Sequence, residues 1–184
     1  MITFEIKPPR NINQIIRILS LFPAKMERAG ADAVRRTLKG GRQDAARKIA
    51  ARYTIKTGRV TETIKTYSKG LQGSMESKGS RINLREFLLK PKKRAKGRPQ
   101  PPDGIFVQNV RGDGGNLFHA WNMFKGGIYQ RVGPPRLPFH GFAGPAAPQM
   151  LGSKPVSSYI VDKMSERLGV NLDHAAQAVL GGFL

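Results

Sequence analysis

Two aspartates and one histidine are the best candidates for catalytic chemistry in this sequence. Asp103, Asp113 and His119 lie near one another along the chain, and carboxylate and imidazole groups can hold a divalent metal ion that activates water for phosphodiester cleavage. Each aspartate, however, is followed by glycine, which is a typical turn dipeptide, and His119 lies in an apolar segment. We therefore expect no metal site and no catalytic residue here.

The rest of the chain offers no catalytic motif. The three histidines are widely separated, and the sequence contains no His-Glu-x-x-His, Gly-x-Ser-x-Gly or phosphate-loop pattern. The absence of cysteine excludes disulfides, thiolate metal sites and a cysteine nucleophile. The glycines at 112–115 favour a tight turn over a nucleotide-binding loop. We expect a protein that is not an enzyme and that uses no cofactor.

The positive charge is concentrated in one half of the chain. The net charge is +20, and residues 1–100 hold 25 Lys and Arg against 7 Asp and Glu, whereas residues 101–184 hold 7 against 5. A field of this sign attracts nucleic acid, an acidic protein surface or anionic lipid, and a merely solvated basic surface is the alternative. Six cations lie in the proline-rich segment 89–102, which we expect to be an exposed loop. The candidate contacts to DNA or to an acidic partner are Lys90, Lys92, Lys93, Arg94, Lys96 and Arg98.

Residues 126–151 combine short extended segments with many glycines and prolines. The alternation over 128–132 predicts a strand, 133–135 must turn because two successive prolines fix φ, and 136–139 resumes an extended path. A helix is expected to open near Ala146. This composition suggests a shaped connector. Base stacking by its aromatic rings is possible in principle, but their setting among prolines favours packing or contact with another subunit. The candidate contact residues are Tyr129, Arg131, Arg136, Phe139 and Phe142.

The elements expected before this connector are a strand over 2–6 and helices in the first third of the chain. Apolar residues at helical spacing run over 12–19 and again over 26–38, where Gly40-Gly41 is the expected stop. A further helix over 43–53 has one apolar and one basic face. Start and composition show no secretory signal, and no apolar stretch is long enough to cross a membrane.

The remaining segments predict strands and then helices. One helical turn is expected at 57–62, strands over 63–68, 74–78 and 105–110, a turn at 111–115, and an apolar core segment over 116–125. Helices over 153–168, ended by Gly169, and over 172–180 complete the chain. We expect a single α+β domain, 1–184, with an antiparallel sheet of roughly five strands flanked by N-terminal and C-terminal helices. Its parts are 1–56 with a strand and helices, 57–151 with the sheet, and 152–184 with the last helices.

Five segments of the sequence carry a resemblance to a known family. They are Gly-Gly-Ile-Tyr-Gln-Arg-Val-Gly at 126–133, Arg-Leu-Pro-Phe at 136–139, Gly-Pro-Ala-Ala-Pro-Gln-Met-Leu at 144–151, Ser-Arg-Ile-Asn-Leu-Arg-Glu-Phe at 80–87, and Gly-Ile-Phe-Val at 104–107. The run resembles the minor tail protein Z family of long-tailed bacteriophages, which is similar to the tail-completion proteins. The likeness is strongest over 80–151; Phe139 stands where isoleucine is usual and Ala146 where serine is usual.

The resemblance implies a structural virion protein at the head-proximal end of a phage tail. Such a protein completes the tail and joins the tail tube or its terminator to the head connector, as a homo-oligomeric ring of six. The implied partners are further copies of the chain, a tail terminator or tail tube protein, head connector or adaptor proteins, and the packaged DNA, with no membrane partner. The implied location is the tail top or neck of the virion, and the host cytoplasm during assembly. The alternative is a basic nucleic-acid-binding protein that contacts phosphates without sequence specificity.

Overall fold

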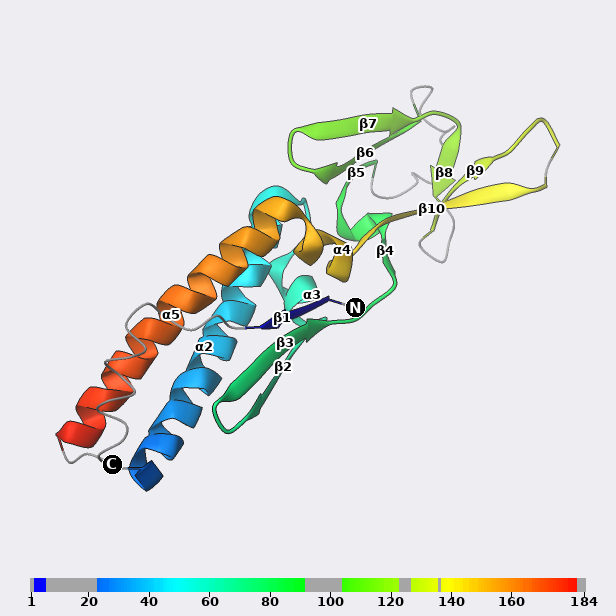
Figure 1. Cartoon of the computed structure of the whole chain (residues 1–184). Coiled ribbons are helices and arrows are strands. Elements are labelled where there is room, and N and C mark those ends of the chain that lie inside the picture. Colours follow the sequence, from blue (N-terminus) through cyan, green and yellow to red (C-terminus); the bar gives the residue numbers. More distant parts are fainter. Residues whose placement is uncertain (1, 6–22, 92–103, 123–126, 136, 182–184) are drawn as a thin grey trace.

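The computed structural model describes residues 2–5, 23–91, 104–122, 127–135 and 137–181. Within them the chain forms four α-helices, one short 3-10 turn and ten strands in three antiparallel sheets, so the expected α+β class is confirmed. A pair of long helices lies at one end of the molecule, and most of the strands lie at the other end (Figure 1). None of the described helices is long and apolar enough to cross a membrane.

The helices are α2 (Pro23–Arg52), α3 (Thr57–Thr61), α4 (Ala147–Gly152) and α5 (Lys154–Leu180). The strands are β1 (Ile2–Glu5), β2 (Ile64–Lys69), β3 (Gln72–Ser77), β4 (Arg81–Asn83), β5 (Leu88–Lys90), β6 (Ile105–Val110), β7 (Asp113–Leu117), β8 (Ala120–Asn122), β9 (Ile128–Arg131) and β10 (Phe139–Ala146), with the 3-10 turn at Leu84–Glu86.

The strands are divided among three small sheets, where the sequence led us to expect one sheet of roughly five. Their orders are β1-β3-β2, β4-β10-β9-β8 and β5-β6-β7. The long strand β10 connects the two parts of the second sheet. It pairs with β9 through its first half and with β4 through its second, and the register shifts between Ala143 and Ala146. Pro145 lacks a backbone donor and Gly144 lacks a side chain, so the regular pairing with β4 is interrupted between Ala143 and Ala146.

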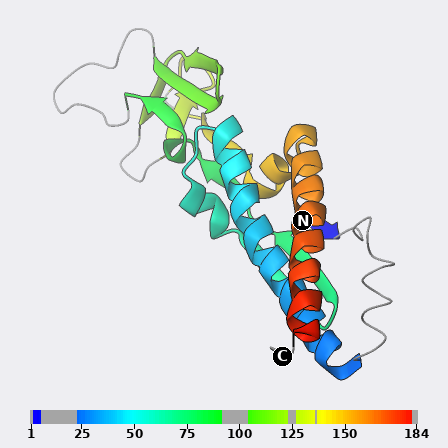
Figure 2. The same cartoon turned by 90° about the vertical axis from the view of Figure 1, so that its left-hand side faces the viewer.

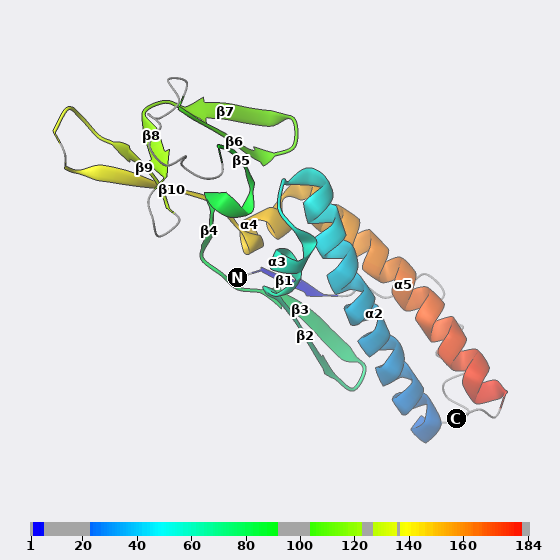
Figure 3. The same cartoon turned by 180° about the vertical axis from the view of Figure 1, so that it is seen from behind.

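Helix α2 continues through Gly40-Gly41, so the predicted stop there is wrong. A Cβ atom at Gly41 would lie 2.8 Å from Cγ of Met164, a buried residue of α5. The glycines therefore allow the two helices to approach closely, and this packing offsets the cost of about 1 kcal/mol that a glycine carries inside a helix. Figures 2 and 3 show α2 and α5 side by side and antiparallel along most of their length.

Helix α5 likewise continues past Gly169, so the two predicted C-terminal helices are one. Its buried stripe does not end at Leu168, because Ala176 and Val179 are also buried. Val179 packs against Ala29 near the first turns of α2. This contact stabilises the last part of α5 against its partner helix.

Besides the small contact of Val179 with Ala29, the described residues form two larger apolar clusters of unequal size. The larger one contains 19 buried residues and joins α2, α4 and α5 to the first sheet. The smaller one contains six buried residues, all from the part of the chain between Leu84 and Ile128. The end of α2 is connected to the end of β6. Tyr53 forms a β-bridge with Val110, and the amide of Arg111 donates to the carbonyl of Arg52 at 2.8 Å.

The described part of segment 116–125, which ends at residue 122, is mostly not the core that its composition suggested. Strand β7 ends at Leu117, the side chain of Phe118 is 57% exposed, and His119 adopts a positive φ of 56°. Only Ala120 of the described residues in this stretch is fully buried. The turn before it is also tighter than predicted: it consists of Arg111-Gly112, and β7 already begins at Asp113.

Candidate interaction surfaces

The predicted contact residues lie on the hairpin of β9 and β10, which extends away from the helices (Figure 1). Because Phe139 is paired with Arg131 and Gly141 with Tyr129, the side chains of Phe139, Arg131 and Tyr129 share one face of the hairpin. Phe142 is paired with Ile128 and lies on the opposite face, against the smaller apolar cluster. The structure therefore brings three of the five candidates together and separates Phe142, while Arg136 lies outside the described residues.

Trp121 joins this face from the neighbouring strand β8, and the sequence analysis missed it. Trp121 is the register partner of Tyr129. Its ring centroid lies 6.3 Å from that of Phe139, and the Tyr129 ring lies 5.2 Å from Phe139, both in edge-on geometry. We call Trp121, Tyr129 and Phe139 the aromatic face. The alternation of a buried Ala120 with Trp121 is the signal that could have placed the tryptophan on this side.

Tyr129 is held in place by glycines. A Cβ atom at Gly127 would lie 2.3 Å from Cε2 of the tyrosine ring, and one at Gly141 would lie 3.1 Å from Cε1. The ring therefore lies over two positions without side chains and is half-buried there. Its first role is to fill this face, and Phe139 and Arg131 are more open to a partner.

The far end of the hairpin exposes apolar side chains. Val132 is 69% exposed, Leu137 63% and Phe139 42%. We call Val132 and Leu137 the apolar tip. The backbone amide of Val132 donates to the carbonyl of Pro138 at 3.2 Å, which closes the hairpin near this tip. Clustered exposed apolar residues of this kind mark protein contact sites more often than single exposed ones do.

The basic candidates are mostly beyond the described part of the chain. Lys90 is exposed at the end of β5. The others, Lys92, Lys93, Arg94, Lys96 and Arg98, lie outside the described residues.

The structure does not assemble the histidine and aspartates into a metal site. Asp113 is exposed at the start of β7, His119 is exposed in the following turn, and Asp103 is outside the described residues. Within the described ranges no group of three or more His, Asp or Glu side chains could hold a metal ion.

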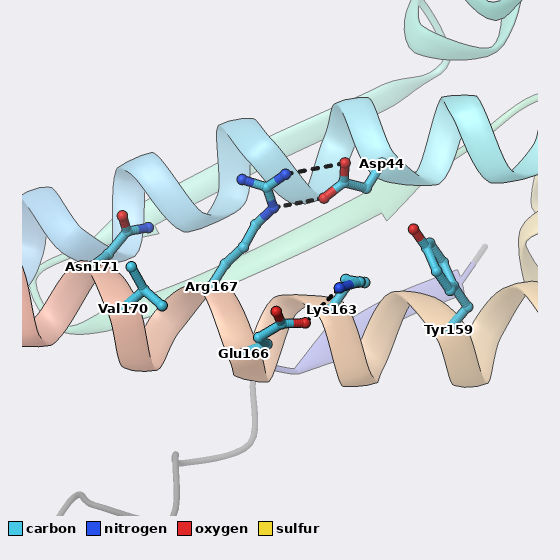
Figure 4. A pocket seen from close by; sticks show the side chains of 7 residues that line it. All are labelled: Asp44, Tyr159, Lys163, Glu166, Arg167, Val170 and Asn171. Atoms are coloured by element: carbon cyan, nitrogen blue, oxygen red, sulfur yellow. Dashed lines mark hydrogen bonds and ion pairs between the residues drawn. The ribbon is translucent and has the colours of Figure 1, made fainter.

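A shallow groove of about 410 Å³ between α2 and α5 is lined by four charged side chains, Asp44, Lys163, Glu166 and Arg167 (Figure 4). Arg167 donates to both carboxylate oxygens of Asp44, at 2.6 and 3.2 Å, and this hydrogen bonding raises the pKa of Arg167. Lys163 forms an ion pair with Glu166 at 2.6 Å, which raises the pKa of the lysine. Each of these groups is paired with a neighbour. The Asp44–Arg167 pair connects α2 to α5, whereas Lys163 and Glu166 both belong to α5.

Two further polar contacts connect α2 to α5. Asn171 donates to the hydroxyl of Thr37 at 2.9 Å, and that hydroxyl donates to the carbonyl of Ala33 at 2.8 Å. The ammonium of Lys48 lies 4.5 Å above the ring of Tyr159. Together with the Asp44–Arg167 pair, these contacts fix the register of α5 on α2.

Comparison with known proteins adds no relative: no family model, curated protein or solved structure matches this chain.

Proposed function

We propose that this protein is a structural virion component at the head-proximal end of a phage tail. It completes the tail and joins the tail tube or terminator to the head connector, without catalysing a reaction. The observation that carries the proposal is that residues 126–151, which resemble the minor tail protein Z family, include the hairpin with the apolar tip and two of the three rings of the aromatic face. A segment with family likeness and an exposed apolar end is suited to assembly.

The proposed assembly is a ring, of six subunits by the family resemblance. A closed ring needs two different surfaces on each subunit, because each copy contacts its neighbours head to tail. The hairpin supplies one of them: Arg131 and Phe139 lie on one face of it, next to the apolar tip. Tail and head proteins are the further proposed neighbours.

A complementation experiment tests the proposal. The coding sequence is deleted from the phage genome, and the protein is supplied with Val132→Ser and Leu137→Ser together. The matched control carries Val170→Ser and Leu180→Ser, which change the same residue types at exposed positions of α5, 50% and 56% exposed. Joined particles are counted by electron microscopy.

We expect the control to restore joined, DNA-filled particles and the apolar-tip variant to leave heads and tails separate. The deletion alone should give the same separated heads and tails. Normal joining and DNA retention in the deletion would disprove the proposed function. Normal joining with the apolar-tip variant would instead remove the hairpin from the assembly contact.

A further inference from the structure

The solvent-facing side of α2 carries a row of cations that the sequence-based candidates did not include. Its members are Lys25, Arg28, Arg35, Arg36, Lys39 and Arg47, all exposed. Successive members are 3, 7, 1, 3 and 8 residues apart. At 3.6 residues per turn all six lie within about one third of the helix circumference, which is one face. We call them the α2 basic stripe.

We infer that the α2 basic stripe binds the phosphate backbone of duplex nucleic acid. At 1.5 Å per residue the stripe is about 33 Å long, a length over which one strand of a duplex presents about ten phosphates. The helix carrying the stripe is continuous from Pro23 to Arg52. The cations therefore form a long straight array on a rigid support, which can neutralise several phosphates at once.

The charges of the stripe are largely free to meet a partner. Its one carboxylate, Asp32, is paired with Arg35 at 3.2 Å, and Arg47 lies 4.0 Å from Asp44, which Arg167 already holds. Among the described residues, Arg28, Arg36 and Lys39 form no ion pair. Arg42 differs from the stripe because its guanidinium is half-buried and donates to the carbonyl of Thr61 at 2.7 Å.

The composition of α2 favours a duplex over other polyanions. No exposed large apolar side chain of the described chain belongs to α2, whereas the centre of a protein interface is apolar and depleted of charge. Helix α2 also contains no aromatic residue, and binding of single strands uses aromatic rings on which bases stack. Contacts of cations to phosphates carry no sequence information, so we expect binding without sequence preference.

The inference depends on the proposed function only for the identity of the nucleic acid, which would be the packaged DNA. Duplex binding itself is tested with the purified full-length protein and a fluorescein-labelled 30-base-pair DNA. Fluorescence anisotropy gives the dissociation constant at several NaCl concentrations. The α2 variant combines Arg28→Gln, Arg36→Gln, Lys39→Gln and Arg47→Gln, since glutamine keeps a similar helix propensity.

Two further variants make the test specific to the helix. The first has the same change in net charge elsewhere, with Lys56→Gln, Lys65→Gln, Lys69→Gln and Arg81→Gln, all at exposed positions. The second replaces the cations of 92–98 by glutamine. Far-UV circular dichroism checks that each variant retains the helix content of the parent.

We expect the α2 variant to lower the slope of log affinity against log salt by about 3 to 4, since each lost phosphate contact removes about 0.9. The control with the same charge change should lower the slope by less than about 1. A slope that falls only when the 92–98 cations are replaced would overturn the inference. An equal loss of binding to poly-glutamate in the α2 variant would also overturn it, since the stripe would then serve acidic partners generally.

The two proposals can fail separately. If the α2 variant loses duplex binding but the apolar-tip variant still joins heads to tails, only the assembly contact is disproved. If the apolar-tip variant fails to join heads to tails but the α2 variant binds the duplex normally, only the nucleic-acid site on α2 is disproved.

Discussion

Asp44 is a largely buried carboxylate whose main partner is Arg167. Its side chain is only 9% exposed, and both of its oxygens accept hydrogen bonds from Arg167, which lies 123 residues away in sequence. Nothing in the local sequence around either residue points to the pair, because neither belongs to a motif and their contact depends on the antiparallel packing of α2 on α5. Contacts of this kind are invisible to pattern analysis.

Replacing Arg167 by glutamine should destabilise the protein by about 1–2 kcal/mol, since a largely buried carboxylate then loses its bidentate partner. The measurement is urea denaturation followed by circular dichroism at 222 nm. The control is Lys163→Gln, which removes an exposed pair within one helix and should leave the midpoint within experimental error. Equal shifts in the two variants would show that the Asp44–Arg167 pair contributes no more than a surface pair.

Gly41 and Gly58 should respond in opposite directions to the same substitution. At Gly41 a methyl group would meet buried Met164, so Gly41→Ala should cost about 1–2 kcal/mol despite the better helix propensity of alanine. At Gly58 in α3 nothing lies within 4 Å of the new atom, so Gly58→Ala should stabilise the protein by about 0.5 kcal/mol. Thermal unfolding of both variants is the measurement, and a stabilised Gly41→Ala protein would contradict the close packing of α2 on α5.

At the scale of elements, local patterns predicted where strands and helices lie better than where they end. Strand β6 occupies the predicted residues 105–110, and α4 begins directly after Ala146, near the predicted position. The stops at Gly40-Gly41 and Gly169 were wrong, because both helices continue. A glycine that can end an isolated helix can also let two helices touch, as Gly41 does against Met164. Only the partner helix distinguishes these two roles, and a single sequence does not show it.

The hairpin of β9 and β10 was predicted as extended segments around a turn, but its aromatic face was only partly predictable. Tyr129 and Phe139 were candidates, whereas Trp121 was assigned to a core segment. Their meeting requires the register of three strands. That register depends on the connection over 132–138, which holds one glycine and three prolines. The partner-facing roles of Arg131 and Phe139 stay predictions.

Replacing Phe139 by alanine should destabilise the protein more than replacing Leu137 by alanine. Phe139→Ala removes edge-on contacts with both Trp121 and Tyr129 and should destabilise the protein by about 1 kcal/mol. Leu137→Ala changes a side chain that is 63% exposed and should shift stability by less than about 0.5 kcal/mol. Urea denaturation followed by the fluorescence of Trp121 reports on this region directly. Equal effects would argue against the aromatic face as a packed unit.

At the scale of the whole molecule, the sequence predicted the α+β class because apolar periodicity changes from helical to alternating and back along the chain. It did not predict three sheets, since the division depends on which strands pair with one another, and a single sequence does not show that pairing. It also did not predict two apolar clusters. Their separation follows from the short strands between Leu84 and Ile128, which bury few side chains against one another.

The two clusters should make unfolding depart from a single transition. The smaller cluster contains six buried residues against 19 in the larger one, so the strands around Trp121 have less apolar burial to hold them. Trp121 is the only tryptophan, and its fluorescence should therefore change at lower urea concentration than the circular dichroism signal of α2 and α5. The control moves the probe to the larger cluster with Trp121→Phe and Tyr53→Trp, where fluorescence and circular dichroism should change together. Coincident transitions for both positions of the probe would show that the two clusters unfold as one cooperative unit.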